Sequence, residues 1–320
     1  MRDTILFGDC RETLKEFDEK ARMCVTSPPY YGLRDYGGEE NQIGQEQTPD
    51  EFIDQLVNVF KEVRNVLTDD GTCWVNLGDS YYNYRPGKGQ GLVKQTVSNT
   101  KQDLPDVCPR RGNRIEGLKE KDLIGIPWQF AFAMRADGWY LRQDIIWHKP
   151  NPMPESVRDR CTKAHEYIFL FSKNKKYFYD NEAIKEPATD WGTRDRSKGK
   201  YKVNDYGQTP HSGLTKSYPT KNKRSVWSVT KKPYKGAHFA VYPPDLIEPC
   251  ILAGSEEGDT VLDPFMGAGT TAAVAKSLNR HYIGCELNED YGNLIQKRIQ
   301  DYQPVNKVVQ EPSINILDII

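Results

Sequence analysis

A glycine-rich turn near the carboxyl-terminal end of the chain has the pattern of a cofactor-binding loop. Residues 260–271 read Thr-Val-Leu-Asp-Pro-Phe-Met-Gly-Ala-Gly-Thr-Thr, a short strand followed by glycines and two threonines that suit a helix start. Gly267 and Gly269 permit tight backbone geometry and close approach of a ligand. Asp263 would repel a pyrophosphate but suits a cationic ligand, such as the ammonium group of S-adenosylmethionine.

An acidic residue follows this loop at a spacing typical of nucleotide sites. Glu286 ends the next β-rich run, 19 residues after Gly267, and an acid at that distance accepts hydrogen bonds from ribose hydroxyls. The third glycine of a dinucleotide fingerprint is missing. An ordinary glycine-rich turn is the alternative, and the Asp-Pro-Phe start with the spaced acid favours the cofactor loop.

A second motif, Ser-Pro-Pro-Tyr, directly follows the β-rich run 23–26. Its two prolines fix the backbone and lack N–H donors, so the carbonyl oxygens remain available as acceptors. Ser27 adds a hydroxyl and Tyr30 a flat ring, and such a set can hold an exocyclic NH₂ while stacking on a planar base. A turn or a proline-rich ligand motif is the alternative, which the position after a strand disfavours.

Together the motifs resemble those of the amino-group DNA methyltransferases that use S-adenosylmethionine, in the β-class order with Ser-Pro-Pro-Tyr first. Segment 7–10 is similar to the strand end that, in this family, reaches the adenine of the cofactor. Segment 238–243 is similar to the segment that closes over the methionine end of the cofactor, and segment 284–287 is similar to the strand end that binds the ribose. The resemblance covers most of 1–180 and 236–303.

The resemblance implies a set of site residues. The catalytic residues would be Ser27, Pro28, Pro29 and Tyr30. The cofactor-binding residues would be Asp9, Cys10, Thr26, His238, Phe239, Asp263, Pro264, Phe265, Met266, Gly267, Ala268, Gly269, Thr270, Thr271, Glu286, Leu287 and Asn288. We expect no metal site, because the five histidines are scattered without ligand spacing.

The implied reaction is direct methyl transfer to an exocyclic amine of a flipped-out base. Within the family, Ser-Pro-Pro accompanies cytosine N4 methylation, and Asp- or Asn-Pro-Pro accompanies adenine N6 methylation. Ser27 therefore favours cytosine, with adenine as the alternative. An RNA or protein-glutamine methyltransferase and an inactive DNA-binding protein are remoter alternatives, which the motif order and the intact motifs disfavour.

Seven β-rich runs, with helical patterns between several of them, must position these motifs. The runs are 4–7, 23–26, 72–77, 144–148, 166–172, 260–262 and 281–285. Helices are predicted over 49–67, with Thr48 as N-cap, over 126–137 and over 270–278. This alternation predicts an α/β fold with a doubly wound parallel sheet. The resemblance implies the seven-stranded Rossmann-like methyltransferase fold with an inserted basic target-recognition region.

Charge is unevenly distributed along the 320 residues. The whole chain carries 44 Lys and Arg against 45 Asp and Glu. Residues 191–235 hold 12 basic and 2 acidic side chains, residues 85–121 hold 9 and 4, and the remainder holds 23 and 39. The neutral average therefore hides an acidic body with two basic insertions, as expected where nucleic acid is bound locally.

These shifts in composition predict the domain organisation. We expect a catalytic region at 1–186 with a basic loop at 83–121, a target-recognition insertion at 187–235, the cofactor-binding part of the catalytic domain at 236–304, and a tail at 305–320. The expected DNA-binding residues are Lys149, Arg194, Arg196, Lys198, Lys200, Lys202, Lys221, Lys223 and Arg224. Lys149 could line the base pocket or lie in a rigid connector.

The remaining composition excludes several classes of protein. Seven scattered cysteines without a Cys-x-x-Cys pair indicate reduced thiols rather than a disulfide framework or structural zinc. Cys250 follows a proline in an apolar, helical run, which favours a core residue over a nucleophile. No apolar run is long enough to span a membrane, and we expect a cytoplasmic protein of a bacterium, archaeon or phage. Double-stranded DNA is the expected partner, while a homodimer and a companion restriction endonuclease are left open.

Overall fold

The computed structural model describes residues 2–32, 42–82, 115–188, 219–231 and 242–303. Its centre is an eight-stranded sheet in the order β1-β10-β9-β2-β3-β5-β4-β8. In chain order these strands are β1 (Thr4–Phe7), β2 (Ala21–Thr26), β3 (Leu67–Leu77), β4 (Tyr140–His148), β5 (His165–Ser172), β8 (Val226–Ser228), β9 (Thr260–Asp263) and β10 (His281–Glu286). A separate two-stranded ladder joins β6 (Glu186–Pro187) to β7 (Thr220–Lys221).

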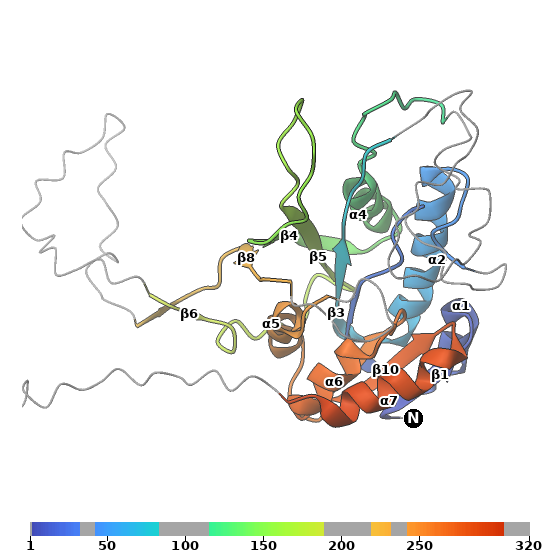
Figure 1. Ribbon diagram of the computed structural model, residues 1–320. Coiled ribbons are helices and arrows are strands. Elements are labelled where there is room, and N and C mark those ends of the chain that lie inside the picture. The colour runs from blue at the N-terminus through green and yellow to red at the C-terminus, as the bar shows by residue number, and fades with distance from the viewer. Residues whose placement is uncertain (1, 33–41, 83–114, 189–218, 232–241, 304–320) are drawn as a thin grey trace, which may run out of the picture.

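Helices cover both faces of the sheet, each with its own hydrophobic core (Figure 1). One face carries α1 (Cys10–Thr13), α2 (Pro49–Val66) and α4 (Ile126–Ala136), and the other carries α5 (Pro244–Gly254), α6 (Thr270–Ser277) and α7 (Gly292–Asp301). Two short 3₁₀ turns are η1 (Leu14–Glu16) and η4 (Glu289–Tyr291). The predicted α/β class and doubly wound arrangement are confirmed.

Helix α2 shows how local sequence builds one of these layers. The Thr48 hydroxyl accepts from the Glu51 backbone N–H at 3.2 Å, and the Glu51 carboxylate accepts from the Thr48 N–H at 3.1 Å, which completes a capping box. The apolar face of this helix is fully buried and consists of Phe52, Leu56, Val59, Phe60 and Val63. The helix ends at Val66, because Leu67 adopts an extended backbone and begins β3.

All seven predicted strands form, but β5 runs antiparallel to both of its neighbours, β3 and β4. The reason lies in the connection 149–164, which contains three prolines and no helix. A parallel return requires a crossover, usually through a helix, so this chain segment comes back as a long hairpin. The hairpin projects from the sheet in Figure 1. The sheet is therefore mixed, although most of its strand pairs are parallel.

The eighth strand, β8, was not predicted, because it lies in the segment 187–235 that we assigned to a basic insertion. It pairs in parallel with β4, with Trp147 opposite Trp227. Trp227 is buried against the core that contains α5 to α7. The described part of 187–235 therefore contributes an edge strand to the main sheet.

The order of the strands reverses between β2 and β9. From β2 the chain passes through α2 to β3, and from β9 it passes through α6 to β10 on the opposite side. The carboxyl ends of parallel strands at such a reversal form the ligand crevice of doubly wound sheets. Cys24 pairs with Leu262, so Thr26 and Asp263 end adjacent strands at this position.

None of the helices in the described ranges is long and apolar enough to cross a bilayer. Within the same ranges, no three His, Cys, Asp or Glu side chains gather as a metal-binding group would.

Cys250 lies inside α5 with no exposed surface, as predicted, and burial raises the pKa of its thiol.

Candidate active site

The ends of β2 and β9 are joined by a buried carboxylate, Asp263. Its Oδ1 accepts from Thr26 Oγ1 at 2.5 Å and from the Phe265 N–H at 3.0 Å. Its Oδ2 accepts from Thr271 Oγ1 at 2.5 Å and from Tyr242 OH at 3.1 Å. Burial raises the pKa of Asp263, and these four donors compensate for the lost water.

This arrangement changes the role expected for Asp263. We predicted a carboxylate that faces a cationic ligand, but four protein donors approach its two oxygens and only 1% of the residue is exposed. In this structure it holds the cofactor loop against the strand that carries Ser-Pro-Pro-Tyr. Tyr242 takes part in this network and was not among the predicted site residues. Its segment was recognised, but a tyrosine hydroxyl carries no sequence signal for a partner so distant in the chain.

The glycine loop folds as its sequence predicts, with one difference. Gly267 and Gly269 have φ angles of 54° and 81°, in the region that favours glycine. A Cβ on Gly269 would lie 2.9 Å from Ile295 Cγ2, so the loop can pack against α7 only without a side chain. Gly269 rather than a threonine is the N-cap of α6. The Thr271 hydroxyl is used by Asp263 instead.

Glu286 ends β10 beside the glycine loop, as the 19-residue spacing predicts. Its Oε2 accepts from the Gly267 N–H at 2.8 Å, and its Oε1 accepts from the Asn288 N–H at 3.0 Å. Each carboxylate oxygen keeps a second lone pair for a ligand hydroxyl. Burial raises the pKa of Glu286. Leu287 and Asn288 continue from this strand end, where Asn288 caps η4.

The end of β1 lies next to the end of β10, since Phe7 pairs with Glu286. Asp9 follows it and accepts hydrogen bonds from the Arg11 N–H and Nε, each at 2.9 Å. Burial raises the pKa of Asp9, but the hydrogen bonds from Arg11 outweigh it and leave the pKa below its usual value. Cys10 is buried in α1. Asp9, which follows β1, therefore lies at the same carboxyl end of the sheet as Glu286, the residue expected to bind a ribose.

These residues fit a nucleoside cofactor. The Thr270 hydroxyl, at the start of α6, is buried and has no hydrogen-bond partner within the described part of the chain. A buried hydroxyl at a helix start is suited to a polar group of a ligand. Pro264, Phe265, Met266 and Ala268 complete the turn between Asp263 and α6. The predicted residues His238 and Phe239 lie outside the described ranges.

The Ser-Pro-Pro-Tyr segment begins where β2 ends, one residue after Thr26. Ser27 and Tyr30 are half-buried, and Pro28 is buried. Tyr30 OH donates to Glu166 Oε2 at 2.7 Å. Glu166 and its ion-pair partner Lys149 come from the facing ends of β5 and β4. Glu166 was not among the predicted site residues, and the only signal was a carboxylate at the start of an apolar strand.

The predicted DNA-binding residues fall into three groups. Lys149 has little exposed surface, and its ammonium group pairs with Glu166. Lys223 and Arg224 lie 3.7 and 3.2 Å from the carboxylate of Glu186, near Lys221 in β7. The others lie outside the described ranges: Arg194, Arg196, Lys198, Lys200 and Lys202.

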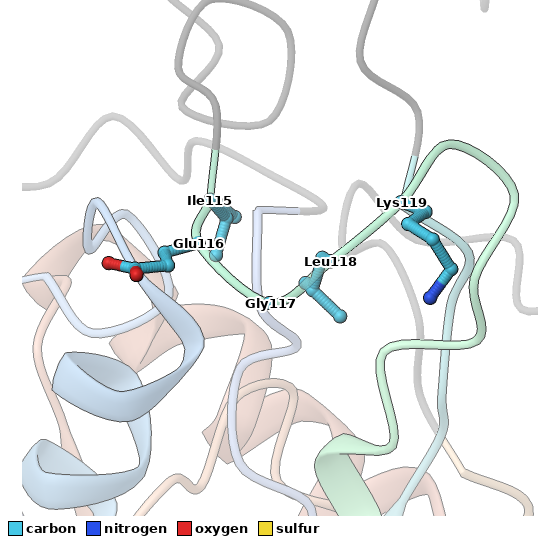
Figure 2. Close-up of a pocket in the computed structure, with 5 residues that line it drawn as sticks. All are labelled: Ile115, Glu116, Gly117, Leu118 and Lys119. Atoms are coloured by element: carbon cyan, nitrogen blue, oxygen red, sulfur yellow. The ribbon is translucent and has the colours of Figure 1, made fainter.

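Figure 2 shows the residues that line a pocket, which has a volume of about 490 Å³. Its lining consists of Ile115, Glu116, Gly117, Leu118 and Lys119. These residues belong to the segment before α4, and none of the predicted site residues is among them.

Comparison with known proteins identifies the family of this chain. Residues 21–297 match the N6/N4 methyltransferase family, described as DNA methylase. The chain belongs to this family of DNA methylases. The methylase is 47% identical to the Type II methyltransferase M.SmaI of Serratia marcescens over 296 residues, with 92% of this chain and 90% of the relative covered. It is 44% identical to M.Cfr9I of Citrobacter freundii over 298 residues, with 93% and 87% covered.

Solved structures confirm the Rossmann-like fold of the methylase. The PvuII DNA methyltransferase (cytosine-N4-specific) superposes with a TM-score of 0.60 at 19% identity, covering 95% of this chain and 89% of that one. A DNA modification methylase from Thermus thermophilus, TTHA0409, complexed with S-adenosyl-L-methionine, gives 0.56 at 22% identity, with 92% of each chain covered. The methylase is thus an enzyme that acts on DNA.

Proposed function

We propose that this methylase is a site-specific Type II enzyme that methylates the exocyclic N4 amine of cytosine in a flipped-out base. The observation that carries the proposal is the Thr26–Asp263 hydrogen bond of 2.5 Å. It joins the strand end that leads into Ser-Pro-Pro-Tyr to the loop that leads into the cofactor residues. The Type II names of relatives at 44–47% identity support the Type II assignment. A cytoplasmic location and a companion restriction endonuclease belong to the same proposal.

The Ser-Pro-Pro-Tyr residues would act by orientation. An exocyclic amine is a weak nucleophile, because its lone pair is delocalised into the ring. Hydrogen bonds from the NH₂ group to the Ser27 hydroxyl and the Pro28 carbonyl favour a pyramidal nitrogen, whose lone pair then leaves the ring plane. Tyr30 stacks on the base and holds that plane. S-adenosylmethionine supplies the methyl group as an electrophilic carbon on a sulfonium sulfur. The gain in rate comes from positioning rather than from a covalent enzyme intermediate.

The DNA must be distorted for this geometry to form. A strand-end site flanked by α/β layers cannot reach an amine that is paired inside a duplex, so the target base turns out of the helix. Lysines and arginines within 191–235 would hold the phosphates on either side of it. Ser27, in the place of an acid or an amide, favours cytosine, and adenine N6 is the competing target.

Tritiated methyl transfer tests the proposal directly. Purified methylase is incubated with labelled S-adenosylmethionine and duplex DNA of diverse sequence, and the digested nucleosides are separated. We expect label in N4-methylcytosine, and sequencing of the modified DNA shows a single recurring context. Label in N6-methyladenine would show that adenine is the target base and would leave the proposed mechanism unchanged. Transfer to RNA or protein but not to DNA would overturn the proposal.

A further inference from the structure

A small polar network lies beside Tyr30 and is not explained by the residues discussed for cofactor or amine binding. Glu166 Oε2 accepts from Tyr30 OH at 2.7 Å, while Glu166 Oε1 forms an ion pair with Lys149 Nζ. Asn76 Nδ2 lies 3.4 Å from the same Oε2 and donates to the Tyr167 carbonyl at 3.0 Å. The network therefore connects the segment after β2 with β3, β4 and β5.

The ion pair is almost completely withdrawn from water. The side chains of Lys149 and Glu166 are 7% and 15% exposed. Lys149 Nζ also lies 4.3 Å from the centre of the Trp147 ring. Burial lowers the pKa of Lys149 to about 8, against the opposite effect of Glu166, and Lys231 lowers it further. Since buried ion pairs contribute little net stability, the fold gains little from retaining this one.

Two groups hold Tyr30, one from the polar network and one from outside it. Glu166 fixes the hydroxyl, and Gly78 packs against the edge of the ring, where a Cβ would lie only 2.7 Å from Tyr30 Cε2. A ring held at its hydroxyl and along one edge cannot rotate freely about its side-chain bonds. The ring plane is thus set before any base arrives, as stacking on a flipped base requires.

We infer that Glu166 and Lys149 are positioning residues, which hold the Tyr30 ring in the plane on which the target base stacks. The inference rests on the proposed function, because it assigns a purpose to the ring that the proposal uses. Lys149 neutralises Glu166 in the dry interior, and Glu166 in turn orients the tyrosine hydroxyl. Neither residue needs to touch the cofactor.

A double-mutant cycle between Tyr30→Phe and Glu166→Gln tests this coupling. If Glu166 acts through the tyrosine hydroxyl, Glu166→Gln lowers kcat at least tenfold in the wild-type background and less than about twofold in the Tyr30→Phe background. The KM for S-adenosylmethionine stays within about twofold in every variant. Equal losses of kcat in both backgrounds would overturn the inference. Glu155→Gln is the matched control, because Glu155 lies in the connection 149–164 just before β5 and its carboxylate pairs with Arg160 at 2.6 Å rather than with Tyr30.

A second variant separates positioning from folding, because Glu166→Gln leaves a buried ammonium group without its partner. Lys149→Met with Glu166→Gln removes both charges at similar volume, a change that proteins tolerate well. We expect the double variant to keep its thermal midpoint within about 5 °C of wild type and to lose at least tenfold in kcat. A folded double variant with wild-type kcat would show that the pair is only structural.

Turnover is not the only measurement available. 3-Fluorotyrosine placed at position 30 alone gives a single ¹⁹F resonance that reports the ring environment with or without activity. We expect one sharp resonance in the otherwise wild-type enzyme and a shifted or broadened one in the Lys149→Met, Glu166→Gln variant. Identical resonances would overturn the inference. A wild-type enzyme that transfers no methyl group would overturn the proposed function alone.

Discussion

At the scale of single residues, the candidate site contains two kinds of group. Some are available to bind a ligand, and others hold the ligand-binding segments in position. The carboxylate of Asp263 accepts hydrogen bonds from four protein donors. The carboxylate of Glu286 accepts hydrogen bonds from two backbone N–H groups and retains lone pairs for a ligand. The proposed function assigns Ser27 and Tyr30 to the target base, and Thr26 immediately before them is fixed by Asp263. The adjacent residues 26 and 27 therefore have different roles.

Replacing Ser27 by alanine tests the residue that we assign to the amine. We expect kcat to fall about 100-fold, because a hydrogen bond aimed at the reacting nitrogen is lost at the moment of transfer. The Kd for S-adenosylmethionine, measured by calorimetry, should stay within about twofold of wild type, since Ser27 does not bind the cofactor. A variant with weakened cofactor binding and normal turnover at saturation would contradict this role.

The raised pKa of Glu286 predicts that cofactor binding depends on pH. Because burial raises this pKa, the carboxylate takes up a proton at a higher pH than an exposed glutamate does. Protonation removes acceptor capacity for ribose hydroxyls, so affinity should weaken as the pH falls from about 7 towards 5. Asp9, whose pKa is lowered, stays ionised in this window. Calorimetry with Glu286→Gln should give weak binding that no longer changes across this range; an unchanged pH profile would exclude Glu286.

At the scale of elements, the connections decide where the site forms. The β2–α2–β3 and β9–α6–β10 units start from the adjacent strands β2 and β9 and extend in opposite directions across the sheet. The turns that follow β2 and β9 therefore lie next to each other at the carboxyl ends of these strands. Strand β5 runs antiparallel to β3 and β4, so its first residues, including Glu166, lie at the carboxyl ends of those strands. A parallel β5 would begin at the opposite edge, and its glutamate would lie far from Tyr30.

Two glycines with the same backbone test the contribution of the cofactor loop. Gly269 and Gly258 have φ angles of 81° and 83°, but a Cβ meets Ile295 at 2.9 Å in the first and nothing within 4 Å in the second. We expect Gly258→Ala to lower the free energy of unfolding by about 1 kcal/mol from backbone strain alone. Gly269→Ala should cost about 3 kcal/mol and abolish cofactor binding. Urea denaturation measures the difference, and equal costs would show that the contact with α7 is unimportant.

At the scale of the whole molecule, the charge of the chain divides into an acidic body and basic segments. The body encloses the sheet and both cores, while most basic residues of 191–235 lie outside the described ranges. Affinity for DNA should depend on these basic residues rather than on the net charge of −1.

The salt dependence of DNA binding tests this division. Replacing Arg194, Arg196 and Lys198 by glutamine should make the slope of log K against log salt concentration less negative by about 0.9 for each phosphate that the variant no longer binds. Glutamine at Lys15, Lys61 and Lys297 is the control, because these exposed residues lie on the acidic body. Equal slopes for both triple variants would place the DNA-binding surface elsewhere.

The sequence by itself determined seven of the eight strands of the main sheet, the helices α2, α4 and α6 and the two motifs, because each depends on local periodicity, capping residues and turn chemistry. Thr48 capped α2, Gly267 and Gly269 formed the loop, and Glu286 ended the strand at the spacing expected. Only the tertiary structure decided that β5 runs antiparallel, that β8 joins the sheet, and that Asp263 serves the fold. It also placed Glu166 and Lys149 beside Tyr30. These contacts join residues up to 237 positions apart, and partners so distant are chosen by packing and burial, which no local pattern encodes.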